Sequence, residues 1–209
     1  MRQLNRKRNT RPRIFPEGNR GFTLIELLIS MAVGLALLAA MYGVFTAHQK
    51  TFGTQELIAE MQQNARVAID MMTREIRMAG YDPLGSAGAG IVSAAANAIT
   101  FTLDTSEDGD TGDSNENITY SLYTTDGIQK LGRKSTATAS NQPVAEHVQS
   151  LVFQYWDVGG GAPATAADVR RIQVRITVQT PRADPDYTPN GGYRRYTLTS
   201  VITPRNLGL

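Results

Sequence analysis

The feature that most constrains the fold of this chain is a long apolar segment near its N-terminus that contains a single carboxylate. Residues 22–45 carry no charged side chain except Glu26. As a helix, this segment would span roughly 36 Å, whereas the hydrocarbon core of a bilayer is about 30 Å thick. The segment is therefore long enough to cross a membrane once. An ionisable group inside such a segment is costly, which marks Glu26 as a candidate functional residue.

A strongly basic leader comes before the apolar segment. It contains seven lysine and arginine residues and one acidic residue, Glu17. Basic residues beside a membrane span hold that end in the cytoplasm, and a short cationic stretch ahead of an apolar one is typical of a targeting peptide. Without residues 1–21 the net charge changes from +2 to −4, so the positive charge of the whole chain does not indicate nucleic-acid binding.

Composition excludes several classes of chemistry. The chain has no cysteine, which rules out disulfides, thiol catalysis and cysteine–metal sites. Its two histidines, His48 and His147, lie in no motif typical of a catalytic triad or a zinc site, and no serine lies in a G-x-S-x-G turn. We therefore expect no enzymatic activity and no cofactor.

Helical periodicity continues beyond the apolar segment. Apolar residues recur at steps of three and four, which predicts one buried stripe on an amphipathic helix. Gly80 offers a left-handed cap and Pro83 blocks continuation, so we predict one helix over residues 22–79. The stripe consists of Leu57, Ile58, Met61, Ala65, Ile69, Met72 and Ile76.

The rest of the chain has the alternating pattern of β-strands. Residues 84–98 are rich in glycine, serine and alanine and are expected to form a loop. Asp126-Gly127 predicts a tight hairpin between two of the strands. Strands that follow a helix without β–α–β alternation indicate an α+β fold with an antiparallel sheet. The expected strands cover residues 99–103, 118–123, 128–131, 148–156, 171–180 and 193–202.

The sequence Gly-Phe-Thr-Leu-Ile-Glu at residues 21–26, between the basic leader and the apolar segment, resembles the class III signal of type IV pilins and pseudopilins. The resemblance implies cleavage between Gly21 and Phe22 by a prepilin peptidase and N-methylation of Phe22. It also implies that Glu26 pairs with the N-terminal amine of a neighbouring subunit during assembly. The alternative for Glu26 is a carboxylate that only reaches toward water at the interface.

A pilin-like fold follows from this resemblance, with a long N-terminal helix packed on a β-rich head. The leader would cover residues 1–21, the transmembrane half of the helix residues 22–45, and its amphipathic half residues 46–80. The head would cover residues 81–209. Before assembly the chain would be a single-pass inner-membrane protein with its head in the periplasm, and after assembly it would lie in an extracellular pilus.

Residues 64–81, which close with Met-Ala-Gly-Tyr, resemble the helix end of PilW-type minor pilins, as do patches of the later strands. The resemblance implies a structural subunit that primes pilus assembly near the tip and supports twitching motility, adhesion or DNA uptake. Its partners would be other minor pilins, the major pilin and the inner-membrane assembly platform, with no nucleic acid. One alternative is a J-like pseudopilin of type II secretion. Another is a periplasmic binding protein or enzyme whose ordinary signal peptide is cleaved near Ala39-Ala40.

An acidic stretch at residues 104–117 is the one candidate for metal binding. Oxygen-rich loops can hold calcium, with Asp108, Asp110 and Asp113 as candidate ligands, but the spacing does not fit an EF-hand. The alternative is a solvated loop.

Aromatic and basic residues in the head have two interpretations each. The aromatic side chains at strand spacing favour packing over an exposed binding patch; they are Phe153, Tyr155, Trp156 and Tyr120. The arginines favour a solvent-facing sheet surface over a DNA contact; they are Arg170, Arg171, Arg175, Arg194 and Arg195.

Overall fold

The computed structural model describes residues 21–138 and 140–208, so the expected leader at residues 1–20 lies outside the described residues. The chain divides into two compact units, one up to Gln49 and the other from Lys50 to Leu209. One long helix, α1 (Leu24–Met78), is followed by eight strands and two short 3-10 helices. The strands are β1 (Ile91–Ala95), β2 (Ala98–Thr102), β3 (Asn117–Thr125), β4 (Ile128–Ser135), β5 (Gln142–Ala145), β6 (Val148–Trp156), β7 (Arg171–Gln179) and β8 (Arg195–Ile202). The 3-10 helices are η1 (Ala166–Asp168) and η2 (Pro189–Gly192).

The helix predicted over residues 22–79 is confirmed, with its start two residues later and its end one residue earlier. Gly80 follows α1 with φ of +80°, the left-handed conformation that ends many helices. A Cβ on Gly80 would also lie only 2.6 Å from a side-chain carbon of Leu207. The helix therefore ends where conformational freedom and close packing both require glycine.

Within the second unit, one stripe of α1 is buried at the predicted helical spacing. Leu57 and Ile58, at the beginning of the stripe, are half-buried, and burial is complete further along the helix. The fully buried side chains of α1 are Met61, Ala65, Ala68, Met72 and Ile76. This stripe joins side chains of both sheets in one hydrophobic core.

The strands form two antiparallel sheets, not the single sheet that we expected. One has the order β1-β2-β3-β4-β5 and the other the order β6-β7-β8. The expected loop at residues 84–98 is also wrong in part, because it contains β1. Its small residues have weak strand propensity, and pairing with β2 overrides that preference. A further strand, β5, was not expected because it is short and holds Pro143, which is tolerated at a sheet edge.

The hairpin predicted at Asp126-Gly127 is confirmed. The two residues have φ of +51° and +73°, and they connect β3 to β4 directly after the Thr125–Ile128 pair. Positive φ at both central residues is the geometry of a two-residue turn whose twist matches that of the flanking strands.

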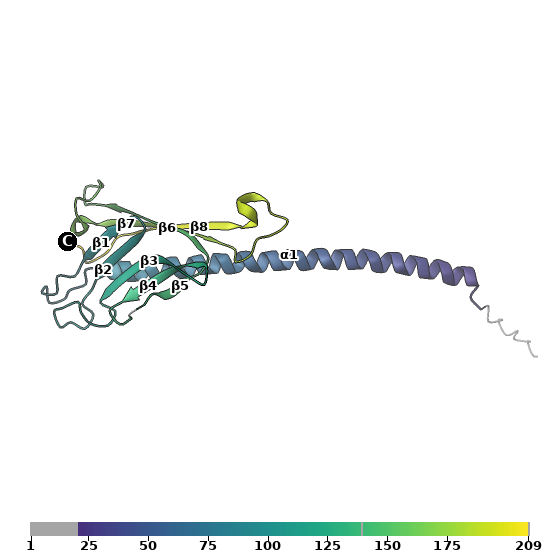
Figure 1. Ribbon diagram of the computed structural model, residues 1–209, viewed down its shortest axis with the longest axis horizontal. Coiled ribbons are helices and arrows are strands. Elements are labelled where there is room, and N and C mark those ends of the chain that lie inside the picture. Colours follow the sequence, from purple (N-terminus) through teal and green to yellow (C-terminus); the bar gives the residue numbers. More distant parts are fainter. Residues whose placement is uncertain (1–20, 139, 209) are drawn as a thin grey trace, which may run out of the picture. The chain divides into compact units, whose positions relative to one another are not determined.

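Polar contacts join the second half of α1 to the head and the two sheets to each other; in the view of Figure 1, β8 lies above α1 and β4 below it. Asn64 Nδ2 donates to the carbonyl of Glu146 at 2.7 Å, in the turn before β6. The Thr73 and Ser200 hydroxyls, on α1 and β8, lie 3.4 Å apart. The Tyr155 hydroxyl of β6 donates to the carbonyls at the β1–β2 turn, at 2.8 and 3.1 Å. Hydrogen bonds as well as core packing therefore join the second half of α1 to the head and the two sheets to each other.

Candidate functional site

The expected processing site lies immediately before the start of α1. Gly21 and Phe22 are exposed and have no helical backbone, and the Phe22 side chain is 86% exposed. A Cβ built on Gly21 meets nothing within 4 Å, so the fold itself does not require glycine there. A peptidase needs an accessible peptide bond outside regular helix, and the Gly21–Phe22 bond meets both conditions.

Glu26 and Thr23 form a capping box at the first turn of α1. Thr23 donates to Oε2 of Glu26 from both its backbone nitrogen and its hydroxyl, at 2.9 Å each. The Glu26 nitrogen donates back to the Thr23 hydroxyl at 3.3 Å. Two of the backbone donors that every helix start leaves without a partner are thereby satisfied. Both side chains are exposed within the described chain.

This arrangement adds Thr23 to the candidate site, a residue that the sequence-based prediction did not include. The signal is nevertheless present in the sequence, because Thr-Leu-Ile-Glu is the spacing of a capping box. From the sequence, Glu26 was expected either to pair with the amine of a neighbouring subunit or to reach toward water at the interface. The structure shows that the carboxylate already accepts hydrogen bonds from its own chain.

Over residues 27–47, α1 has no charged side chain, and its large apolar side chains are exposed. Among the described residues, α1 is the one helix long and apolar enough to cross a membrane, by length and composition. Its polar side chains bond locally: Ser30 Oγ donates to the Glu26 carbonyl at 2.7 Å, and Thr46 Oγ1 to the Gly43 carbonyl at 3.0 Å. Satisfied polar groups and exposed apolar ones are what a helix needs in a lipid or a helix-packed environment.

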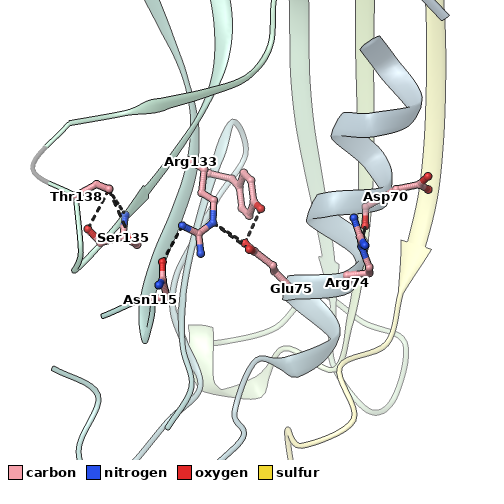
Figure 2. A network of polar contacts seen from close by, with 8 residues as sticks. Asp70, Arg74, Glu75, Asn115, Arg133, Ser135 and Thr138 are labelled. Carbon is pink, nitrogen blue, oxygen red and sulfur yellow. Dashed lines mark hydrogen bonds and ion pairs between the residues drawn. The ribbon is translucent and has the colours of Figure 1, made fainter. Parts of the chain in front are cut away.

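A polar network holds the second half of α1 against the five-stranded sheet (Figure 2). Figure 2 shows the Glu75 side chain directed from α1 toward Arg133 of β4, which in turn reaches Asn115. Arg133 Nε lies 3.0 and 2.9 Å from the two Glu75 oxygens. The Tyr120 hydroxyl donates to Glu75 at 2.6 Å. Burial, together with the neighbouring Glu75 carboxylate, raises the pKa of Tyr120, so this phenol stays a donor at every physiological pH.

Arg74 does not form the side-chain ion pair that its i,i+4 spacing from Asp70 suggests. Its Nε donates instead to the Asp70 backbone carbonyl at 3.3 Å (Figure 2). The polar face of α1 is thus divided: Glu75 is committed to the sheet, whereas Arg74 stays exposed.

The acidic loop between β2 and β3 is organised by backbone donors. Buried Asp104 accepts from the nitrogens of Glu107 and Gly109 at 2.7 and 3.0 Å. Buried Glu116 accepts from Thr105, Ser106 and Asp113 nitrogens at 2.9 to 3.2 Å. Hydrogen bonds from these nitrogens, the Ser106 one above all, hold the pKa of Glu116 below its usual range.

The calcium candidates do not converge in the structure. Asp108 and Asp110 each accept a backbone hydrogen bond from within the loop, from the nitrogens of Asp110 and Gly112. In the chain outside residues 1–20, 139 and 209, no group of three His, Asp or Glu side chains is placed to hold a metal ion. The loop owes its order to Asp104 and Glu116 instead.

Packing is confirmed for Phe153 and Tyr120, which are buried, and Tyr120 stacks on Phe101 with ring centroids 6.5 Å apart. Tyr155 and Trp156 are half-buried.

The five arginines divide into two groups. Arg170 and Arg194 bond within the chain, and the others are exposed on β7 and β8; these are Arg171, Arg175 and Arg195.

Comparison with known proteins points to the same N-terminal region. Residues 18–42 match the family described as the prokaryotic N-terminal methylation motif. Among curated proteins, none matches the chain. Among solved structures, a type IV-like pilin from Thermus thermophilus is similar over 70% of this chain and 98% of its own, with 13% sequence identity and a TM-score of 0.44. The chain thus carries a prepilin-type methylation motif at the start of its apolar helix.

Proposed function

We propose that this protein is a type IV pilin-like filament subunit that a prepilin peptidase cleaves between Gly21 and Phe22. The carrying observation is the methylation motif over residues 18–42, which includes the first part of the apolar segment of α1. Exposure of the Gly21–Phe22 bond ahead of the first helical turn supports this assignment. The protein would act as a structural part, with no catalytic step of its own.

Glu26 would direct assembly from inside the apolar segment. The charge is costly in an apolar phase unless it is paired, so a subunit that offers a cation to Glu26 is favoured over lipid. Cleavage creates such a cation, the amine of Phe22. The contacts of Thr23 with the carboxylate support this role, because they fix one rotamer of Glu26 and leave Oε1 without a hydrogen bond from Thr23.

More specifically, we propose a minor pilin that primes pilus assembly and is incorporated near the tip, in support of twitching motility, adhesion or DNA uptake. The support is the likeness of residues 64–81 to PilW-type minor pilins. Its partners would be the other minor pilins, the major pilin and the inner-membrane assembly platform. The unit from Lys50 to Leu209 would lie in the periplasm before assembly and on the pilus surface afterwards.

The N-terminus of the protein from its native membrane tests the assignment. Mass analysis of intact protein and N-terminal peptides should find a chain that starts at N-methylated Phe22. A chain that starts near Met41 would instead mean an ordinary exported protein. Such a result would contradict the proposed function.

A matched variant separates processing from folding. Gly21→Leu should leave the fold unchanged, because a side chain at this position meets no other atom. The same variant should block cleavage, so the protein keeps its leader and stays in the membrane. If Gly21→Leu is cleaved like the parent chain, the peptidase does not recognise this site.

A further inference from the structure

Three exposed arginines form one surface on the outer side of the three-stranded sheet. We call this surface the arginine face; it consists of Arg171 and Arg175 of β7 and Arg195 of β8. Alternate residues of β7 are buried in the core, which places the arginines on the opposite side of the sheet. The sequences of β6, β7 and β8 contain no aspartate or glutamate. The face is therefore positively charged along its whole length.

The register of the strands spaces these charges evenly. Arg171 and Arg175 are four residues apart on β7, or about 13 Å. Arg195 of β8 pairs with Gln179, which is four residues further along β7. The Arg171 guanidinium lies over the Trp156 ring, 4.8 Å from its centroid, and this contact leaves its charge at the surface.

The three arginines have no ion-pair partner in the described part of the chain. Other arginines of the same region do have internal roles. Arg170 donates to the carbonyls of Ala167 and Val169 at 2.6 and 2.9 Å, and Arg194 pairs with Asp184 at 2.9 Å. The contrast indicates that the arginine face is open to a partner outside the chain, because no carboxylate within the described residues neutralises its charges.

The acidic loop carries the complementary charge. Four of its carboxylates are exposed, and residues 104–116 contain no basic residue. The backbone bonds to Asp104 and Glu116 fix the loop, so little conformational entropy is lost when it meets a cationic surface. The exposed carboxylates belong to Glu107, Asp108, Asp110 and Asp113.

We propose that the arginine face of one copy of this chain receives the acidic loop of a second copy. The inference rests on the proposed filament function and deepens it by naming a contact between heads. Since the two surfaces differ, the contact is heterologous: one copy keeps a free acidic loop, the other keeps a free arginine face, and the pair has one free surface of each kind. Repetition of such a contact builds an open assembly, as a filament requires.

Placement of the two surfaces suits a staggered arrangement. The acidic loop lies at the end of α1, where the Asp104 nitrogen donates to the Tyr81 carbonyl at 2.7 Å. Arg171 lies toward the same end of the head, since the neighbouring Ile172 pairs with Ile202, just before the bond from Arg205 to Arg77. Arg175 is about 13 Å further along the sheet. A second copy displaced by about 13 Å along the β7 direction, from Arg171 toward Arg175, would have its acidic loop level with Arg175.

Disulfide trapping tests this contact, because the natural chain has no cysteine. Thr199→Cys places a thiol opposite Arg175, and Ser114→Cys places one on the acidic loop; both positions are exposed. The two full-length variants would be mixed in detergent and oxidised with diamide. We expect a linked dimer from the mixture and none from either variant alone. Salt should suppress it, with less product at about 500 mM than at about 50 mM NaCl.

Charge reversal makes the test specific. Arg175→Glu with Arg195→Glu on the Thr199→Cys chain should lower the yield about tenfold, and Asp108→Lys with Asp110→Lys on the Ser114→Cys chain should restore it. Absence of a cross-link, a yield indifferent to charge, or dimers of Thr199→Cys alone would overturn the proposal. So would capture of single-stranded DNA by the arginine face in place of the second copy. Cleavage at Gly21 is scored on the same samples, so failure of this contact stays distinct from failure of the proposed function.

Discussion

The Arg133 Nε atom lies 2.9 Å from Oε2 of Glu75, and this ion pair joins β4 to the second half of α1. The two side chains are 12% and 25% exposed, so water screens the pair only in part. The Tyr120 hydroxyl donates to the same carboxylate. A helix that is hydrophobic at its other end is thereby fixed in rotation against the sheet, because Glu75 can meet both partners from only one face of α1.

Loss of the Arg133 side chain should destabilise the head. Arg133→Gln removes the charged donor and leaves the Glu75 carboxylate half-buried beside Tyr120, at an expected cost of about 1.5–3 kcal/mol in the free energy of unfolding. Chemical denaturation of the full-length protein in detergent measures this change. Glu75→Gln combined with Arg133→Gln is the matched control, because it removes both charges. If the double variant is no more stable than Arg133→Gln alone, the uncompensated carboxylate is not the cause.

Removal of a core side chain from the buried stripe of α1 should lower the free energy of unfolding by more than loss of the Arg133 side chain does. Met72 is fully buried among residues of the shared core, and Met72→Ala should lower the free energy of unfolding by about 2–5 kcal/mol through lost burial and a cavity. Val67, on the other side of the same helix, is 50% exposed, and Val67→Ala should change it by about 0.5 kcal/mol or less. Equal losses at both positions would show that the stripe does not carry the packing of α1.

Much of this architecture could be predicted from periodicity alone. The bounds of β6 are those expected, and α1 differs from expectation by one or two residues at its ends. Periodicity fails at β1, whose alanines and serine resemble those of a loop. That strand exists because β2 pairs with it and because the Tyr155 hydroxyl binds carbonyls of the turn between them. These contacts depend on the tertiary fold and have no local signal.

The candidate site also contains residues that the local sequence marks and residues that only the tertiary fold reveals. The local sequence marks Gly21, Phe22 and Glu26, and it also contains the capping signal of Thr23. The link between Glu75 and Arg133 joins residues 58 positions apart, and in the sequence Glu75 resembles any other charge on the polar face of an amphipathic helix. Only the packing of β4 on α1 shows that this carboxylate faces inward.

Acid should weaken the loop that Glu116 organises. The pKa of Glu116 is below its usual range in the folded protein, so its contribution to stability is fully present above about pH 4.3, the ordinary glutamate value. That contribution is lost as the pH falls through the lower folded pKa. Glu116→Gln keeps one acceptor oxygen but loses the charge, so the variant should melt several degrees lower at neutral pH.

The difference in melting temperature between the parent chain and Glu116→Gln should therefore shrink as the pH falls below about 4. Thermal melts of both full-length proteins from neutral to acidic pH measure it. Asp126→Asn, at the exposed β3–β4 turn, serves as a control for general charge effects. A difference that stays constant with pH would mean that the ionised form of Glu116 has no special role.

Substitutions at Thr23 and Glu26 should separate membrane insertion from assembly. Glu26→Val removes the charge and makes the segment more apolar, so insertion should be intact while incorporation into filaments falls. Thr23→Val removes the hydroxyl that holds Oε2 at 2.9 Å and should impair incorporation less, because the backbone donor of Thr23 remains. Thr23→Ser keeps the hydroxyl and should behave like the parent chain. Subunit content of sheared filaments, relative to membrane-bound protein, measures these effects. Normal incorporation of Glu26→Val would show that the carboxylate does not direct assembly, whereas a defect in Thr23→Ser would show that the threonine methyl group, and not the hydroxyl, matters at this position.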